Sequence, residues 1–275
     1  MKNKSYKLIV VRLIVISVFL IAYMSVKILN RKNMKTYGKV IVLNGPSGSG
    51  KSSIQKEFQY LMMLQPSDYA KATLDKSPKD GVYPAVPAEA LCEGWERAKR
   101  IEGADRQTLW IKLGIDTLFD KPMPDINLEN IQFWQSENPI RWVQTAHDEQ
   151  GNPVITLFAG QQGEKVAYGM NSAIADYAKN GCNVIVDYIA YKKEWLDDLQ
   201  TKLKDIKTYW VKVTLPLDII EQREIARGTS PKGHARSHYD TVYWDLKYDL
   251  TVNSGIHSAK EIAQQVKEFV EGYKA

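Results

Sequence analysis

The sequence predicts an α/β fold: a three-layer α/β/α sandwich around a parallel sheet, preceded by one hydrophobic helix near the N-terminus. Three observations support this prediction. Short apolar runs rich in β-branched residues recur along residues 39–275, and segments with helical periodicity separate them. A glycine-rich turn joins the first apolar run to the first helical segment. Alternating strands and helices favour a parallel sheet that is covered on both faces.

The first strand and the turn after it form the clearest motif. Residues 39–43, Lys-Val-Ile-Val-Leu, are an apolar run typical of a buried parallel strand. Gly45–Ser52 follows with the sequence Gly-Pro-Ser-Gly-Ser-Gly-Lys-Ser, and residues 53–63 have helical periodicity. Strand, glycine-rich turn and helix together predict a P-loop, whose backbone N–H groups surround a polyphosphate at a helix N-terminus.

The P-loop spacing assigns roles to its polar side chains. Lys51 is expected to reach the β- and γ-phosphates of ATP, and the Ser52 hydroxyl is expected to hold Mg²⁺. The sequence therefore predicts a nucleotide site made of Gly45, Pro46, Ser47, Gly48, Ser49, Gly50, Lys51, Ser52, Ser53 and, from a later helix, Arg223.

Four further strands and four further helices are expected to complete the sandwich. The strands are residues 110–115, 183–186, 209–213 and 248–252, and the helices are residues 164–180, 195–203, 216–227 and 259–273. Residues 140–158 alternate on either side of a Gly-Asn-Pro turn and predict a β-hairpin. Residues 229–238 are expected to form a polar loop, and residues 65–105 an insertion into a P-loop kinase domain of residues 37–275.

Two acidic residues follow predicted strands directly. Asp116 comes after the second strand, and Asp187 ends the third. Chemistry in such sheets collects at the carboxyl ends of the strands. Asp116 is therefore the candidate base that orients an acceptor hydroxyl, with a helix N-cap before Thr117 as the plainer role. Asp187 is placed to hold Mg²⁺, with a structural hydrogen bond in the loop as the alternative.

Basic residues cluster where a lid over the phosphates would begin. Arg223 and Arg227 lie four residues apart on one predicted helix, directly before a loop with Gly and Pro, and Arg236 lies at the end of that loop. Arg227 is the candidate that stabilises the transferred phosphoryl group, together with Lys51. The plainer interpretation is that these arginines are solvated charges near a helix C-terminus.

Composition excludes several other kinds of site. The net charge is +5, but residues 1–39 hold seven Lys, two Arg and no acid, so residues 40–275 carry −4. A mildly acidic body offers no broad electrostatic surface for nucleic acid. Two cysteines are too few for a disulfide framework, and the four histidines do not combine with them at zinc spacing.

The N-terminal 36 residues contain a hydrophobic segment and a basic linker. Leu8–Val26 is apolar apart from Arg12 and a few other residues, which is about the 20 residues that a membrane-spanning helix needs. Three interpretations stay open: an uncleaved transmembrane anchor with the kinase domain in the cytoplasm, a cleaved signal peptide, or an unused upstream start. Translation from Met34 would give a soluble cytoplasmic protein.

In combination, these motifs resemble the chloramphenicol phosphotransferase family of P-loop kinases. The similarity covers most of residues 39–270. It includes the P-loop opening from Leu43, the stretch Trp110–Leu118 before Met123-Pro124, the strand ending at Asp187, and a carboxyl third with Arg223-Glu-Ile-Ala-Arg227-Gly228, Gly233 and Tyr248–Val252. The resemblance implies a kinase fold that phosphorylates a small-molecule hydroxyl from ATP, with Asp116 matching the family's base.

The sequence departs from this family at the lid and near the acceptor. Thr229 and Ser230 stand where the family continues with Asp-Arg, so one lid arginine is missing, and Arg236 is the expected substitute. Tyr188 replaces the family's second acid, and Tyr243 replaces a family histidine. These changes concern the acceptor more than the reaction type.

The leading hypothesis is an ATP- and Mg²⁺-dependent kinase that acts on a hydroxyl of a small molecule and is held at the membrane by one helix. A nucleoside monophosphate kinase is the alternative within the enzymes, because the P-loop also resembles that of guanylate kinases. The third hypothesis is a membrane-tethered nucleotide-binding module without transfer activity. The altered lid sequence, which lacks one arginine, is the reason for considering this hypothesis.

Overall fold

The structure of the protein is a computed structural model that describes residues 37–62, 109–120 and 123–272. The hydrophobic helix expected within residues 1–36 and the insertion expected at residues 65–105 lie outside these ranges. Among the described helices, none combines the length and apolar character that crossing a bilayer requires.

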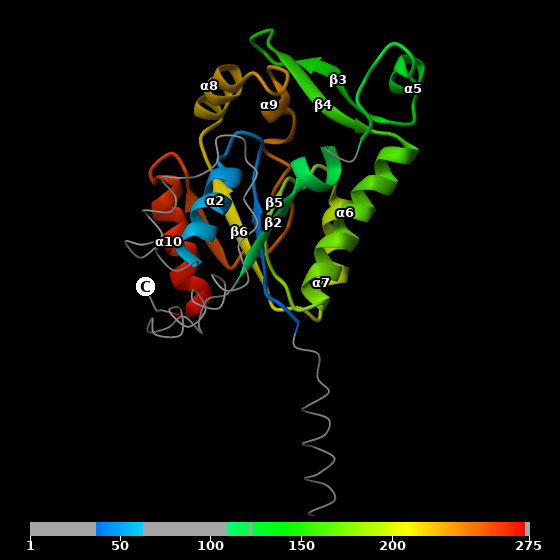
Figure 1. Ribbon diagram of the computed structural model, residues 1–275. Coiled ribbons are helices and arrows are strands. Elements are labelled where there is room, and N and C mark those ends of the chain that lie inside the picture. Colours follow the sequence, from blue (N-terminus) through cyan, green and yellow to red (C-terminus); the bar gives the residue numbers. More distant parts are fainter. Residues whose placement is uncertain (1–36, 63–108, 121–122, 273–275) are drawn as a thin grey trace, which may run out of the picture. The chain divides into compact units, whose positions relative to one another are not determined.

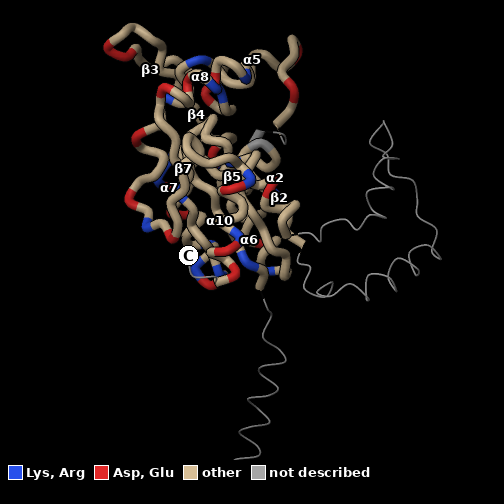
Figure 2. Tube along the Cα trace, turned by 90° about the vertical axis from the view of Figure 1, so that its left-hand side faces the viewer, with Lys and Arg blue, Asp and Glu red and all other residues tan. Residues whose placement is uncertain are grey.

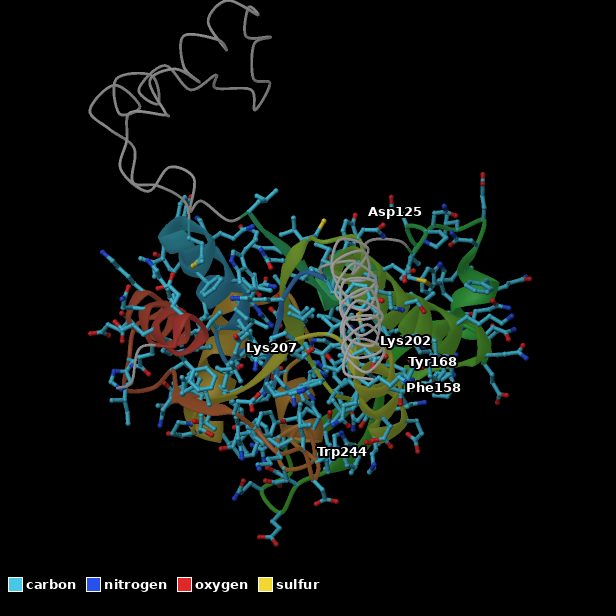
Figure 3. All side chains as sticks on the ribbon, turned by 90° about the horizontal axis from the view of Figure 1, so that it is seen from below. Asp125, Phe158, Tyr168, Lys202, Lys207 and Trp244 are labelled. Atoms are coloured by element: carbon cyan, nitrogen blue, oxygen red, sulfur yellow. The ribbon has the colours of Figure 1, made fainter. Side chains whose placement is uncertain are left out.

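A parallel sheet of five strands forms the centre of the described part of residues 37–272 (Figure 1). The strands, in spatial order, are β2 (Trp110–Gly114), β5 (Asn183–Tyr188), β1 (Val40–Asn44), β6 (Thr208–Thr214) and β7 (Leu250–Asn253). Figure 3 views this part of the chain from the amino ends of the strands, where Lys207 directly precedes β6. The predicted α/β fold with a parallel central sheet is confirmed.

Helices cover both faces of this sheet (Figure 1). One face carries α2 (Lys51–Met62) and α10 (Ala259–Glu271), and the other carries α6 (Gln161–Lys179) and α7 (Lys193–Leu203). Successive β1 side chains point to opposite faces, because a strand alternates with a period of two. Ile41 and Leu43 therefore pack in one apolar cluster with Phe58, whereas Val40 and Val42 pack in the other cluster.

Further elements lie above the carboxyl ends of the strands (Figure 1). The predicted hairpin is confirmed as β3 (Ile140–His147) paired antiparallel with β4 (Pro153–Ala159). The remaining short elements are the π-helix η2 (Asp116–Asp120), α5 (Ile131–Gln135), α8 (Leu217–Arg227) and α9 (His234–His238). Figure 2 shows acidic and basic residues interspersed along the described part of the chain.

The helix α9 corrects the expectation of a polar loop over residues 229–238, because the second half of that segment is helical. Glu224 of α8 explains the difference. Its carboxylate is buried and accepts hydrogen bonds from the backbone N–H groups of Gly233, at 2.7 Å, and Ala235, at 2.9 Å. A side chain from a preceding helix thus satisfies the N–H groups that a short polar helix leaves unpaired.

Replacing Glu224 with Ala should destabilise this region strongly. The substitution leaves two buried backbone N–H groups without an acceptor, and we expect a loss of about 3 kcal/mol in the free energy of unfolding. Chemical denaturation of the purified protein measures this loss. Gln222→Ala, at an exposed position of the same helix, is the matched control and should change stability by less than about 0.5 kcal/mol. Equal effects of the two variants would contradict the role assigned to Glu224.

Candidate active site

The P-loop connects β1 to α2 at the carboxyl edge of the sheet. Lys51 is buried, and its Nζ donates hydrogen bonds to the carbonyl oxygens of Gly45, at 2.9 Å, and Pro46, at 2.8 Å. The Lys51 side chain therefore turns back over the loop that precedes it. A polyphosphate held by the loop would meet this ammonium group and the N-terminus of α2 together.

Asp187 and Ser52 lie directly beside this lysine. The Ser52 hydroxyl donates a hydrogen bond of 2.5 Å to Oδ2 of Asp187. Oδ1 of Asp187 is 3.5 Å from Lys51 Nζ and accepts no hydrogen bond from the described residues. The structure thus brings together the two residues that the sequence predicted as Mg²⁺ ligands.

The donors at this position fit Mg²⁺. A hydroxyl and a carboxylate are hard oxygen ligands, and Mg²⁺ characteristically takes one or two carboxylates and completes its shell with substrate phosphates and water. Within the described ranges, no group of three or more His, Cys, Asp or Glu side chains could hold a metal ion. A metal held by Ser52 and Asp187 would have further coordination positions for phosphate oxygens and water.

The backbone of Asp116 lies at the same edge of the sheet. Gly114, the last residue of β2, pairs in register with Asp187 of the neighbouring strand β5. Asp116 follows two residues later and begins the π-helix η2. Because the carboxyl ends of parallel strands meet at one edge, the Asp116 backbone lies at the same edge of the sheet as Asp187 and the P-loop, with β5 between β2 and β1.

Two of the predicted arginines approach the P-loop from α8. Arg227 donates a hydrogen bond of 3.0 Å from Nη2 to the hydroxyl of Ser47. Arg223 donates to the carbonyl oxygen of Ser254 at 3.1 Å, and its Nη1 lies 3.8 Å from where a Cβ on Gly50 would stand. The spacing of four residues on a helix places both guanidinium groups on one face. The lid arginines predicted by the sequence are therefore adjacent to the nucleotide loop.

Arg236 has a different environment from the one expected of a lid cation. Its Nε donates to Oε1 of Glu221 at 2.7 Å, and its guanidinium also forms an ion pair with Asp148 of the hairpin loop. Both partners are carboxylates, so the charge of Arg236 is compensated inside the protein. The structure gives Arg236 the role of joining α8 and α9 to the hairpin.

Sequence reasoning did not single out the two histidines of α9. His238 accepts a hydrogen bond at Nε2 from the backbone N–H of Ser47, 3.1 Å away. His234 packs against Trp142, with 4.1 Å between ring centroids, and its Nε2 is 2.9 Å from the hydroxyl of Tyr191. The available signal was two histidines four residues apart directly after the lid loop, a spacing that places both on one helix face.

Both histidines are held in the neutral form. Burial lowers the pKa of His234 to about 4, with further lowering by the charges of Arg227 and Lys51. Burial also lowers the pKa of His238 well below 6.5, and the charge of Lys51 acts in the same direction, as a proton on His234 would. At neutral pH, His238 therefore offers a lone pair, which fits its role as acceptor for the Ser47 N–H group.

A family model described as chloramphenicol phosphotransferase-like protein matches residues 103–271 of the chain. The matched range includes Asp116, Asp187, Arg223 and Arg227, and it begins after the P-loop. A protein of Mycobacterium tuberculosis strain H37Rv with the name "Putative O-phosphotransferase" is 23% identical over 236 residues. These cover 84% of this chain and 81% of that protein.

Solved kinase structures also align with the chain. The APS kinase CysC of Mycobacterium tuberculosis, in complex with AMPPNP and APS, is 16% identical, with a TM-score of 0.44. The alignment covers 86% of this chain and 98% of that chain. A gluconokinase of Sinorhizobium meliloti is 15% identical with a TM-score of 0.39, and the alignment covers 88% of this chain and 99% of that chain.

The burial of His234 should make stability depend on pH. The pKa of His234 is about 4 in the folded protein and about 6.5 in the unfolded chain, so the unfolded chain binds the extra proton first as pH falls. This contribution to stability is complete above pH 6.5 and is lost as pH falls toward 4. Between pH 7 and 5 we expect it to lower the free energy of unfolding by about 2 kcal/mol.

Urea denaturation at the two pH values, on the natural protein and on His234→Gln, isolates this contribution. Groups remote from His234 that titrate in the same interval affect both proteins alike. The loss between pH 7 and 5 should be smaller in the variant by about 2 kcal/mol. An identical loss in both proteins would show that His234 does not titrate as described.

Proposed function

Because the chain belongs to the chloramphenicol phosphotransferase-like family, we propose that it is a kinase that transfers the γ-phosphoryl group of ATP to a hydroxyl of a small molecule. The observation that supports this most directly is the contact of Ser52 and Lys51 with Asp187 at the P-loop. Phosphoryl transfer needs a binding site for ATP, a bound metal and positive charge near the transferred group. These residues would provide the phosphate contacts, the metal ligands and the positive charge.

On the donor side, the loop residues Gly45–Ser53 hold the triphosphate with their backbone N–H groups, apart from Pro46, which has none. Lys51 exchanges its contacts with the carbonyl oxygens of Gly45 and Pro46 for the β- and γ-phosphates. Arg223 and Arg227 contact the nucleotide from α8. Arg227 lies at Ser47 and stabilises the charge that develops on the transferred group.

Ser52 and Asp187 would hold Mg²⁺, which supplies neutralisation of the charge on the β- and γ-phosphate oxygens when it is bound. The hydroxyl and carboxylate are 2.5 Å apart, so one ion can contact both with little rearrangement. The fold orients this pair, because Ser52 lies in the first turn of α2 and Asp187 lies near the end of β5.

On the acceptor side, Asp116 is the proposed base. The acceptor oxygen attacks the γ-phosphorus, the bond from that phosphorus to the β–γ bridging oxygen breaks, and ADP leaves. Asp116 orients the hydroxyl and accepts its proton late in the transfer. Support comes from the backbone position of Asp116 after β2, at the edge that also carries Asp187, and from its match to the family's base.

The protein should produce a phosphorylated small molecule, and Asp116 should control the rate. We would incubate the full-length protein with MgATP and a library of hydroxyl compounds that includes chloramphenicol and nucleoside monophosphates. Mass spectrometry then detects the phosphate adduct. Asp116→Asn should retain ATP binding and lose about a hundredfold or more in turnover, because the amide cannot accept the proton.

Lys51→Ala is the complementary variant, and it should weaken ATP binding itself. Unchanged turnover in Asp116→Asn would exclude this residue as the base. Phosphorylation of nucleoside monophosphates alone would favour a nucleoside monophosphate kinase. ATP binding without an adduct from any compound would favour the nucleotide-binding module.

Removing the carboxylate of Asp187 should weaken the response to magnesium. We expect Asp187→Asn to lower the affinity for ATP in the presence of Mg²⁺ by about tenfold, with little change in affinity for ATP in excess EDTA, since the lost interaction is with the metal. Calorimetric titration of ATP under both conditions measures the difference. Equal weakening in both would indicate that Asp187 acts on the loop structure and not through Mg²⁺.

A further inference from the structure

The third residue of the P-loop is contacted from two sides. Ser47 donates its backbone N–H to His238 Nε2 at 3.1 Å, and its hydroxyl accepts a hydrogen bond from Arg227 at 3.0 Å. Arg227 is the last residue of α8 and His238 is the last residue of α9, and they are 180 and 191 residues away from Ser47 in the sequence. His238 therefore accepts a hydrogen bond from a backbone N–H group of the loop that is expected to bind phosphate.

His238 contacts the same part of the loop as two cations that are expected to bind the terminal phosphate. Lys51, which is expected to reach the β- and γ-phosphates, contacts the carbonyl oxygens of Gly45 and Pro46 immediately before Ser47. Arg227, the lid cation expected to contact the transferred group, binds the hydroxyl of the same Ser47. The edge of the imidazole thus shares its surroundings with both of these cations.

A phosphate oxygen beside Nε2 changes what this nitrogen can do. In the structure Nε2 is an acceptor, so it directs a lone pair at the loop. A lone pair directed at an anionic oxygen is repulsive, whereas an N–H group directed at it forms a charge-assisted hydrogen bond. Favourable contact with phosphate therefore requires a proton on Nε2.

The surroundings of His238 permit this change. Its other nitrogen, Nδ1, is 3.4 Å from the hydroxyl of Ser237, which can donate or accept. The groups that face the ring are Tyr191 and His234 on the sides, with a hydrogen bond to the His234 backbone, and Ser47 and Lys51 toward the loop. The charge of Lys51 disfavours a second proton on the imidazole while the loop holds no phosphate, and a bound triphosphate compensates this charge.

On the basis of the proposed function, we infer that His238 is a further contact for the terminal phosphate of ATP. It accepts the Ser47 N–H while the loop is empty and donates from Nε2 to the γ-phosphate once ATP is bound. Arg236 does not serve as a further cation at the phosphate, since Glu221 and Asp148 hold its guanidinium.

The direct test is nitrogen NMR of the full-length, unaltered protein labelled in its histidines. The chain has four histidines, so single substitutions at the other three assign the His238 signals. On addition of MgATP, we expect Nε2 of His238 to move from the shift range of a nitrogen with a lone pair to that of a protonated nitrogen. MgADP should leave it unprotonated. An Nε2 that keeps its lone pair with MgATP would overturn the inference.

Affinities of two variants provide an independent test. His238→Leu, which can neither donate nor accept, should lower the affinity for MgATP by about tenfold and that for MgADP by less than about threefold. His238→Gln retains both functions and should remain within about threefold of the natural protein for both nucleotides. His147→Leu, at an exposed position of the hairpin, is the matched control and should change neither affinity.

A purely structural role of His238 predicts another result, because a loosened loop would lose affinity for MgATP and MgADP equally. That outcome would overturn the inference even if the variant is less stable. Failure of the unaltered protein to bind MgATP would overturn the proposed function, and this inference with it. Binding of MgATP with an unprotonated Nε2 would overturn this inference alone.

Discussion

The close approach of β2 to β5 is the constraint on which the site depends. Gly114 pairs with Asp187, and a Cβ on Gly114 would lie 2.6 Å from the backbone oxygen of Asp187. Only glycine allows this spacing, because real Cβ atoms do not approach a carbonyl oxygen so closely. Gln55 of α2 then donates to the carbonyl oxygens of Leu113, at 2.7 Å, and Ile185, at 2.8 Å. The helix that carries Ser52 is thereby fixed against both strands.

The parts of the site that the sequence could predict are those with local signals. The P-loop combines a fixed spacing with a strand before it and a helix after it, and each part needs only its neighbours in the chain. Asp116 and Asp187 could be singled out because the ends of apolar runs mark the ends of strands, and parallel strands end at one edge. The hairpin was predictable because alternation and a turn sequence occur within a short stretch.

The parts that could not be predicted depend on partners far away in the chain. The α9 segment looks like a polar loop until the buried Glu224 is present to accept its N–H groups. Arg236 looked like a lid cation because its carboxylate partner Asp148 is 88 residues away. The spacing of His234 and His238 indicated only a shared helix face, and it could not show the contact of His238 with Ser47, which is 191 residues away. No local pattern identifies such contacts, because side-chain partners across a fold are set by tertiary packing.

The short helix α9 joins the β3–β4 hairpin to the P-loop. Gly233, directly before α9, accepts a backbone hydrogen bond of 3.1 Å from Ile155 of the hairpin, and a Cβ on Gly233 would lie 1.9 Å from the oxygen of Pro153. At its other end, α9 places His238 on the P-loop. Packed segments with such close contacts shift together and do not deform independently. A displacement of the hairpin would therefore be transmitted through α9 to the contact between His238 and Ser47.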